Sequence, residues 1–261
     1  MAADMGWASR VRDAFENDKF NLAYQPIVSI HDGHIHAYEV LLRMKLDDGD
    51  IILPGGFMPA AERFGLINHV DRWTVRAAMY KLAELHHADP TIHFAINLSG
   101  RAFEDKELLP LINGILKQTG LEPSSLTFEI TESAAISNLT AATKFIYQLK
   151  DMGCEFALDD FGTGFSSFAY LKNLPVDKLK IDGSFVKGLA DTRMDQAMVQ
   201  SMNQIAHALG KKTIAEFVEN ESTLDMLRAY GVDYAQGYYL SKPRSSIILS
   251  PTGTQQEIIM I

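Results

Sequence analysis

The sequence has a single cysteine, fewer basic than acidic residues and no apolar run long enough to cross a bilayer. With Cys154 alone among 261 residues, no intrachain disulfide can form, which favours a reducing, cytoplasmic location. No apolar stretch approaches the roughly 18 residues of a membrane-spanning helix, and residues 1–20 lack the apolar core of an export signal. The net charge is −9, so we expect no DNA or RNA polymer as a partner.

The proportions that are present belong to a globular protein. Apolar residues make up 47% of the chain and charged residues 22%. A lead-in helix is expected over 1–19. The turn signal Asp32-Gly33 separates two strand-like segments, 20–30 and 34–44. This turn is too short for a parallel crossover, so the two strands should be antiparallel.

Strand-like and helix-like segments alternate along the rest of the chain. After an expected loop over 47–56, helices are expected over 58–66, 70–86, 105–117, 140–152, 167–172, 195–209 and 222–230. Strands are expected over 92–98, 126–131, 155–160, 178–182, 213–218 and 234–240. Eight strands predict an α/β fold closed into a (β/α)8 barrel with its first strand antiparallel. An open doubly wound sheet would use the same elements. We expect one domain over 20–244 and a tail over 245–261.

Polar side chains interrupt or follow strands that should be almost wholly apolar in a parallel sheet. In chain order they are Glu39, Arg43, Asn97, Glu129, Glu132, Asp159, Asp160, Lys180, Asp182, Glu216, Glu219 and Gln236. In a barrel, the C-terminal ends of the strands converge on one mouth. One such acid is usually a solvated cap, but burying several carboxylates together without cations is costly. Their oxygen atoms therefore indicate a hard divalent cation: Mg²⁺, Mn²⁺ or Ca²⁺.

Three smaller features leave alternatives open. Arg43 lies four residues after Glu39, where it could hold a phosphate or form an internal ion pair with that glutamate. Gly162 and Gly164 indicate either a loop that moves over the site or an ordinary tight turn. The eight histidines are expected mostly on turns and helix surfaces, without the spacing of a zinc site.

Eight motifs then occur in a fixed order. They are QPI (25–27), EVLLR (39–43), NLS (97–99), FEITES (128–133), LDDFGTG (158–164), LKID (179–182), EFVE (216–219) and QGY (236–238). Together they resemble the EAL domain, the bacterial phosphodiesterase of cyclic di-GMP (c-di-GMP), over about residues 20–243. The resemblance implies a barrel related to the triosephosphate isomerase (TIM) fold.

The resemblance also implies the chemistry: hydrolysis of c-di-GMP to linear 5′-pGpG with two divalent cations, Mg²⁺ or Mn²⁺, and inhibition by Ca²⁺. The implied metal ligands are Glu39, Asn97, Glu129, Asp159, Asp160 and Glu216. Lys180 would orient the attacking water, and Glu216 is a candidate general base. The implied substrate contacts are Gln25, Leu41, Arg43, Asp182, Gln236 and Pro243. Glu132 and Glu219 would anchor the loop over 161–167.

Partners also follow from the resemblance. We expect a homodimer. We also expect sensory or cyclase domains in the same protein. This chain would then be a cytoplasmic part of a larger protein, which in one interpretation is membrane-bound. The alternative is a catalytically silent c-di-GMP receptor that acts through partner binding. A glycoside hydrolase would leave Asn97, the two aspartates and Arg43 without roles.

Two positions depart from the family pattern. The signature Glu-Ala-Leu is Glu39-Val40-Leu41, a change that a strand should tolerate. The usual glycine between the two acids of the seventh strand is Phe217. If that position needs a positive φ, phenylalanine would disturb the site. The alternative is that the side chain points outward against a helix. Since no metal-site residue is lost, we expect activity.

Overall fold

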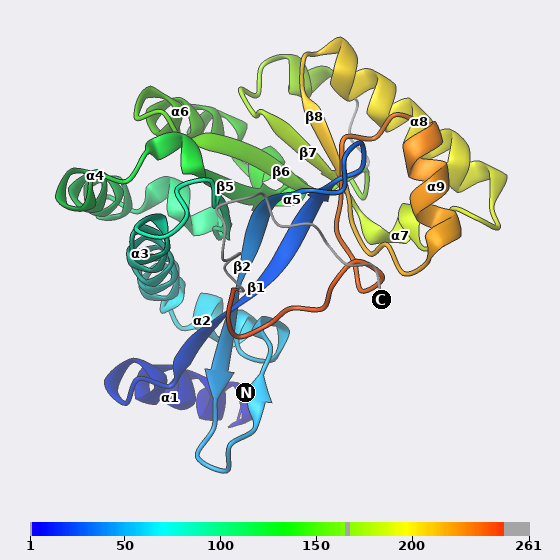
Figure 1. Cartoon of the computed structure of the whole chain (residues 1–261). Coiled ribbons are helices and arrows are strands. Elements are labelled where there is room, and N and C mark those ends of the chain that lie inside the picture. Colours follow the sequence, from blue (N-terminus) through cyan, green and yellow to red (C-terminus); the bar gives the residue numbers. More distant parts are fainter. Residues whose placement is uncertain (1, 165–167, 248–261) are drawn as a thin grey trace.

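Eight strands close into a barrel in the computed structural model, which describes residues 2–164 and 168–247 (Figure 1). The strands are β1 (Phe20–Ser29), β2 (Ile35–Lys45), β4 (Phe94–Asn97), β5 (Leu126–Thr131), β6 (Glu155–Phe161), β7 (Lys178–Ile181), β8 (Lys212–Ala215) and β9 (Tyr234–Ala235). Strand β1 is antiparallel to both β2 and β9, and the remaining pairs around the ring are parallel. The (β/α)8 barrel with an antiparallel first strand is therefore confirmed.

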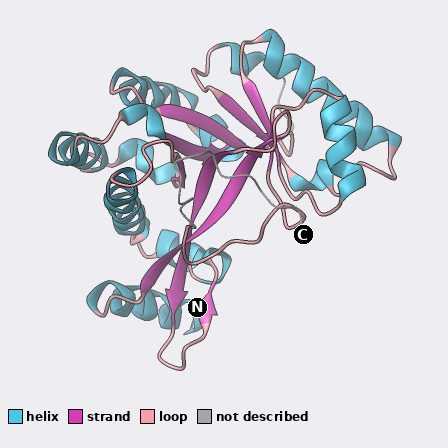
Figure 2. Cartoon of the chain, viewed as in Figure 1, coloured by secondary structure: helices cyan, strands magenta, loops and turns pink. Residues whose placement is uncertain are grey.

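Helices surround the barrel on the outside (Figure 2). The α-helices are α1 (Ala2–Glu16), α2 (Met58–Arg63), α3 (Ile67–His86), α4 (Leu108–Thr119), α5 (Glu132–Ser137), α6 (Leu139–Asp151), α7 (Gly183–Val186), α8 (Arg193–Ala208) and α9 (Glu221–Ala229). Helix α6 illustrates why they pack there: Ala142, Phe145, Ile146 and Leu149 recur at helical spacing and are all buried. Its N-cap is Asn138, whose side chain accepts a hydrogen bond from the amide of Ala141.

Several local predictions need correction. The expected loop over 47–56 contains a two-residue strand, β3 (Ile51–Ile52), paired with the end of β2, and a 3-10 turn (Pro54–Gly56). The expected strand over 234–240 is only two residues long. The short helix expected over 167–172 is a 3-10 turn over Phe168–Lys172, and residues 165–167 and 248–261 lie outside the described residues. No helix in the described ranges is both long and apolar enough to span a membrane.

The interior of the barrel is layered. A cluster of strand residues alone fills its middle: Ile27, Ala37, Ala95 and Ile214, with Tyr234 packed against them. It is separate from the larger core between strands and helices. Polar side chains therefore enter the barrel only above this layer, at the C-terminal mouth, and below it, at the base.

The β1–β2 hairpin extends beyond the mouth and carries a second core. Phe20, Leu42 and Met44 pack there with residues of α1, α2 and α3. In Figure 1 this extension, with α1 and α2, projects from the barrel next to the N-terminus. The hairpin face that carries Glu39 and Arg43 is the opposite one, because successive residues of a strand alternate.

Candidate active site

Lys180 lies at the centre of the barrel mouth, fully buried among carboxylates. Its Nζ atom is 2.9 Å from Glu129, 2.9 Å from Glu216, 3.2 Å from Asp159 and 3.8 Å from Glu39. Burial alone would lower the pKa of Lys180, but the carboxylates outweigh burial and hold it well above its ordinary value. The lysine is therefore a permanent ammonium at this point.

One ammonium does not balance the carboxylates around it. With Asp160 included, five carboxylates face one lysine, so the fully ionised group carries an excess of four negative charges. Burial raises the pKa of Glu129 to about 8, and repulsion from Glu39 and Asp159 acts in the same direction. Burial likewise raises the pKa of Glu216 to about 8. The mouth must therefore bind protons or cations.

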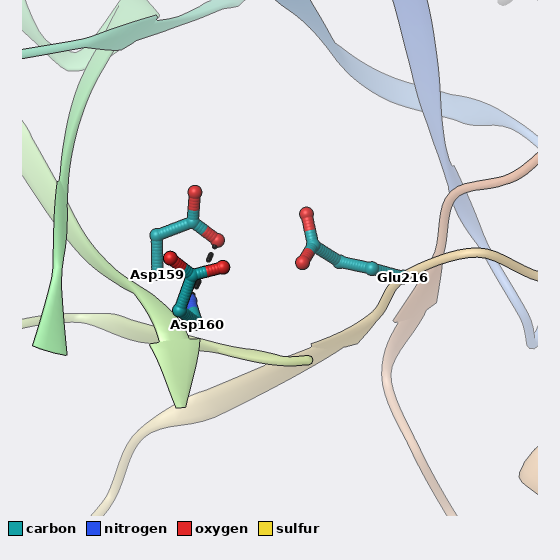
Figure 3. Close-up of side chains that lie close together, drawn as sticks. All are labelled: Asp159, Asp160 and Glu216. Atoms are coloured by element: carbon teal, nitrogen blue, oxygen red, sulfur yellow. Dashed lines mark hydrogen bonds between the residues drawn. The ribbon is translucent and has the colours of Figure 1, made fainter. Parts of the chain in front are cut away.

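The two adjacent aspartates face the same way, which a regular strand forbids. Asp160 has φ +55°, and the register of β6 against β7 shifts between Leu158 and Phe161. This local break cancels the usual alternation, so both carboxylates point toward Glu216 from the opposite side of the mouth (Figure 3). Oxygen atoms of Asp159, Asp160 and Glu216 lie within 4.8 Å of one another, and the Asp160 amide donates to Asp159 Oδ1 at 2.9 Å.

The amide side chains of Asn97 and Gln236 orient the carboxylate of Glu39. Asn97 Nδ2 donates to one oxygen of Glu39 at 2.6 Å, and Gln236 Nε2 donates to the other oxygen at 2.6 Å. The same Nε2 lies 3.2 Å from Gln25 Oε1, and Gln25 itself donates to the carbonyl oxygen of Ser241. Four of the expected site residues thus form one connected network.

The remaining expected substrate contacts lie at the rim of the mouth. Leu41 and Arg43 are half-buried on the hairpin, and Arg43 Nη1 donates to the Leu42 carbonyl oxygen at 2.8 Å. Within the described residues it makes no ion pair with Glu39, so that alternative is wrong. Asp182 caps α7 by accepting from the Ser184 amide. Pro243 is half-buried beside Arg244, whose backbone pairs with Tyr24 of β1.

Glu132 holds both sides of the loop that follows β6. It is the first residue of α5 and is buried, not a residue left exposed past a strand end. Its carboxylate accepts from the Gly162 amide at 2.9 Å and from the Tyr170 hydroxyl. Sequence reasoning missed Tyr170, and no motif singled it out. Glu219 is exposed, and residues 165–167 of the loop over 161–167 that it was expected to anchor lie outside the described ranges.

Phe217 has both features considered for it in the sequence: a positive φ and a side chain that points outward against a helix. Its φ is +54°, a left-handed conformation that non-glycine residues seldom adopt. Its side chain points out of the barrel and is 50% exposed. The ring lies against Gly183 of α7, and the Glu216 carboxylate lies inside the mouth, 2.9 Å from Lys180 Nζ.

The residues of the mouth fit divalent cations. The anionic groups of the cluster are carboxylates, whose oxygen atoms are the ligand type that Mg²⁺ and Mn²⁺ prefer. Glu129 Oε1 is buried and accepts no hydrogen bond from any described residue. A buried carboxylate oxygen without a donor is costly, and a cation would satisfy it.

Residues 8–243 match the EAL domain family. The chain belongs to the EAL domain family. It is 36% identical over 239 residues to cyclic di-GMP phosphodiesterase PdeF of Escherichia coli strain K12, covering 92% of this chain and 32% of that protein. It is 38% identical to cyclic di-GMP phosphodiesterase PdeB of Shewanella oneidensis, covering 91% of this chain and 28% of that protein. The EAL chain thus spans about a third of the length of these curated relatives.

Solved EAL structures have the same barrel. The FimX EAL domain of Pseudomonas aeruginosa bound to c-di-GMP superposes with a TM-score of 0.87 at 34% identity, covering 94% of this chain and 98% of that one. The PaMucR phosphodiesterase in complex with c-di-GMP gives a TM-score of 0.86 at 35% identity, covering 92% and 97%. These values establish the TIM-type fold for this EAL domain.

Proposed function

We propose that this EAL domain hydrolyses c-di-GMP to linear 5′-pGpG with two divalent cations, Mg²⁺ or Mn²⁺. The observation that carries the proposal is the buried mouth in which one lysine faces five carboxylates, with an unpaired Glu129 oxygen. Relatives named cyclic di-GMP phosphodiesterases support the substrate. Two EAL structures that hold c-di-GMP support binding at this fold.

The proposed ligand set divides between two sites. One cation would be held by Glu39, Asn97, Glu129 and Asp159, and the second by Asp159, Asp160 and Glu216. Bound there, the cations supply Lewis acidity: they lower the pKa of water and stabilise charge on the phosphate oxygens. Ca²⁺ should inhibit, because it is larger and accepts looser geometries than Mg²⁺.

The protein's own groups position the reactants and move the proton. The oxygen of water attacks phosphorus, the bond from phosphorus to one ribose 3′ oxygen breaks, and that oxygen takes a proton from solvent and leaves as a hydroxyl. Lys180 Nζ, fixed between Glu129 and Glu216 at 2.9 Å from each, would orient the water. Glu216, whose carboxylate lies 2.9 Å from Lys180 Nζ, is the candidate acceptor of its proton.

The rim residues would hold the rest of the substrate. The half-buried guanidinium of Arg43 suits a phosphate, since it can donate two parallel hydrogen bonds. Gln25 and Leu41 would contact the substrate from the hairpin, Asp182 and Pro243 from the loops, and Gln236 a guanine edge. Gln236 Oε1 supports this role, because it is buried and accepts from no described side chain or backbone group.

We further propose a cytoplasmic homodimer in which Glu132 and Glu219 anchor the loop after β6. The contact of Glu132 with the Gly162 amide supports the first anchor. The long curated relatives support the presence of sensory or cyclase domains elsewhere in the same protein, since this chain covers only about a third of their length.

Chromatography of c-di-GMP incubated with the protein tests the proposal. We expect pGpG with Mg²⁺ or Mn²⁺, and intact substrate with EDTA or Ca²⁺. In the matched variant Asp159→Asn/Asp160→Asn, turnover should be lost. Formation of pGpG at the same rate in EDTA would overturn the metal-dependent mechanism.

The second candidate is a receptor that binds c-di-GMP without cutting it. One observation favours it: the similar FimX EAL domain holds c-di-GMP itself, as a receptor would. Intact substrate with every metal, together with binding by calorimetry, would decide for the receptor.

A further inference from the structure

Phe217 is the one strained position at the mouth whose side chain offers no local compensation. Among described non-glycine residues, only Asp18, Asp160 and Phe217 have positive φ. Aspartate tolerates this conformation because its short carboxylate can bond to nearby backbone. Phenylalanine cannot, so contacts elsewhere must maintain the turn.

The Phe217 ring has such contacts on α7. A Cβ atom added to Gly183, the first residue of α7, would lie 2.2 Å from Phe217 Cδ2, so the ring rests directly against that glycine. At the C-terminal end of α7, the Nζ atom of Lys187 is 4.2 Å from the ring centroid, a cation–π contact. Although half-exposed, the ring is therefore seated between a glycine and an ammonium.

The backbone beyond the turn is held just as closely. The Val218 amide donates to the Gln236 carbonyl oxygen at 3.0 Å, and the Tyr239 amide donates to the Val218 carbonyl oxygen at 3.0 Å. A Cβ added to Gly237 would lie 2.1 Å from that carbonyl oxygen. On the near side, the Glu216 amide donates to the Ile181 carbonyl oxygen at 3.2 Å. Phe217 is thus the turning point between two fixed segments.

We propose that Phe217 is a positioning residue: its ring, seated between Gly183 and Lys187, holds the left-handed turn that keeps the Glu216 carboxylate on Lys180 and facing the two aspartates. The proposal rests on the proposed function, because Glu216 matters through the cations and the water. Glycine at this position would reach the same turn by its own conformational freedom. Alanine would have neither the freedom nor the ring.

Single variants separate this role from others. We expect Phe217→Ala to lower kcat about tenfold, to weaken Mn²⁺ binding measured by calorimetry, and to leave KM within about twofold. Phe217→Gly should keep kcat and Mn²⁺ affinity within about threefold of the parent. If Ala and Gly both raise KM and spare kcat, the ring contacts substrate and the proposal is wrong. If Phe217→Ala lowers only the melting temperature, the role is merely structural and the proposal is equally wrong.

A double-mutant cycle gives the sharper test. Gly183 has no positive φ, and the three atoms nearest to an added Cβ all belong to the Phe217 side chain, so Gly183→Ala should act by pushing against that side chain. In the parent it should reduce kcat and Mn²⁺ affinity as Phe217→Ala does. In the Phe217→Gly background it should change neither, because the ring is gone. Equal losses in both backgrounds would overturn the proposal. If the parent hydrolyses nothing, the function fails, while the Mn²⁺ calorimetry still tests the positioning.

Discussion

Strand β7 carries two lysines into the barrel, one at each end, and their surroundings differ. At the base, Lys178 forms an ion pair with the single carboxylate of Glu155 and donates to the Thr127 hydroxyl at 3.2 Å. Burial raises the pKa of Glu155, but the charge of Lys178 outweighs it and the net pKa is lowered. At the mouth, the pKa of Glu129 stays raised in spite of Lys180.

The comparison shows how to tell a structural ion pair from a site. At the base the charges balance, because one ammonium faces one carboxylate. The ammonium also donates a hydrogen bond to a hydroxyl. At the mouth the charges do not balance, because its carboxylates outnumber its cation and keep an unpaired oxygen. Such an excess of buried negative charge lowers the stability of the fold. A bound cation would neutralise part of the excess negative charge at the mouth.

Exchanging each lysine for methionine should separate the two ends most strongly. Lys180→Met is expected to lower turnover about 10³-fold, because the water loses its orienting ammonium. Lys178→Met should leave turnover within about threefold, while the free energy of unfolding falls by about 1–2 kcal/mol, since Glu155 is partly exposed when it loses its partner. Chromatography of the product and urea unfolding, both with Mg²⁺ present, measure the two quantities. Similar activity losses in both variants would contradict the comparison.

The next effect is on the stability of the metal-free protein between about pH 4.5 and 8. Glu129 and Glu216 have folded pKa values of about 8, above the ordinary 4.5, so the unfolded chain releases their protons first. The contribution of these two glutamates to stability should therefore be complete below pH 4.5 and be lost, by several kcal/mol, as the pH rises from 4.5 through 8. Urea unfolding in EDTA measures this fall.

Saturating Mn²⁺ should reduce this loss of stability between pH 4.5 and 8, because bound cations replace the protons. Burial also raises the pKa of Asp71 to about 7, so an Asp71→Asn background isolates the share of the mouth. A slope unchanged by Mn²⁺ in that background would mean that the cluster binds no cation.

A smaller pH effect is expected at the base, and it has the opposite sign. Burial, helped by the charge of Lys178, lowers the pKa of His36 to about 4. Its stabilising contribution is therefore present above pH 6.5 and is lost, by about 2–3 kcal/mol, as the pH falls toward 4. His36→Phe keeps a ring against Tyr234, on which His36 stacks at 4.2 Å, and should reduce the acid slope without changing turnover. A slope equal to that of the parent would contradict this assignment.

The sequence was sufficient for the barrel because its signals are repetitive. Alternating segments and the short Asp32-Gly33 turn predicted eight strands with the first antiparallel. Polar residues at strand ends predicted the convergence of Glu39, Asn97 and Lys180, since strand ends of a barrel meet at one mouth. These inferences need only periodicity and topology.

The missed features depend on single backbone angles and close contacts. Nothing in the pattern shows that Asp160 adopts φ +55°, that β9 ends at Ala235 or that Gly237 lies against Val218. Strand β3 has two residues and no period. The histidines were expected mostly on turns and helix surfaces, yet His36 lies within β2, where the pairing with β1 shifts register, and strand alternation alone does not predict its neighbours.

The reversed first strand also sets the mechanical layout of the domain. Because β1 runs opposite to its neighbours, α1 stands at the mouth and not at the base, joined to Gln25 by a few residues of one stiff ribbon. In that ribbon Gln25 lies opposite Glu39. A tilt of α1 would move this ribbon as a rigid body, and with it the Glu39 carboxylate that Asn97 and Gln236 hold in place. The movement would not have to pass through the rest of the barrel.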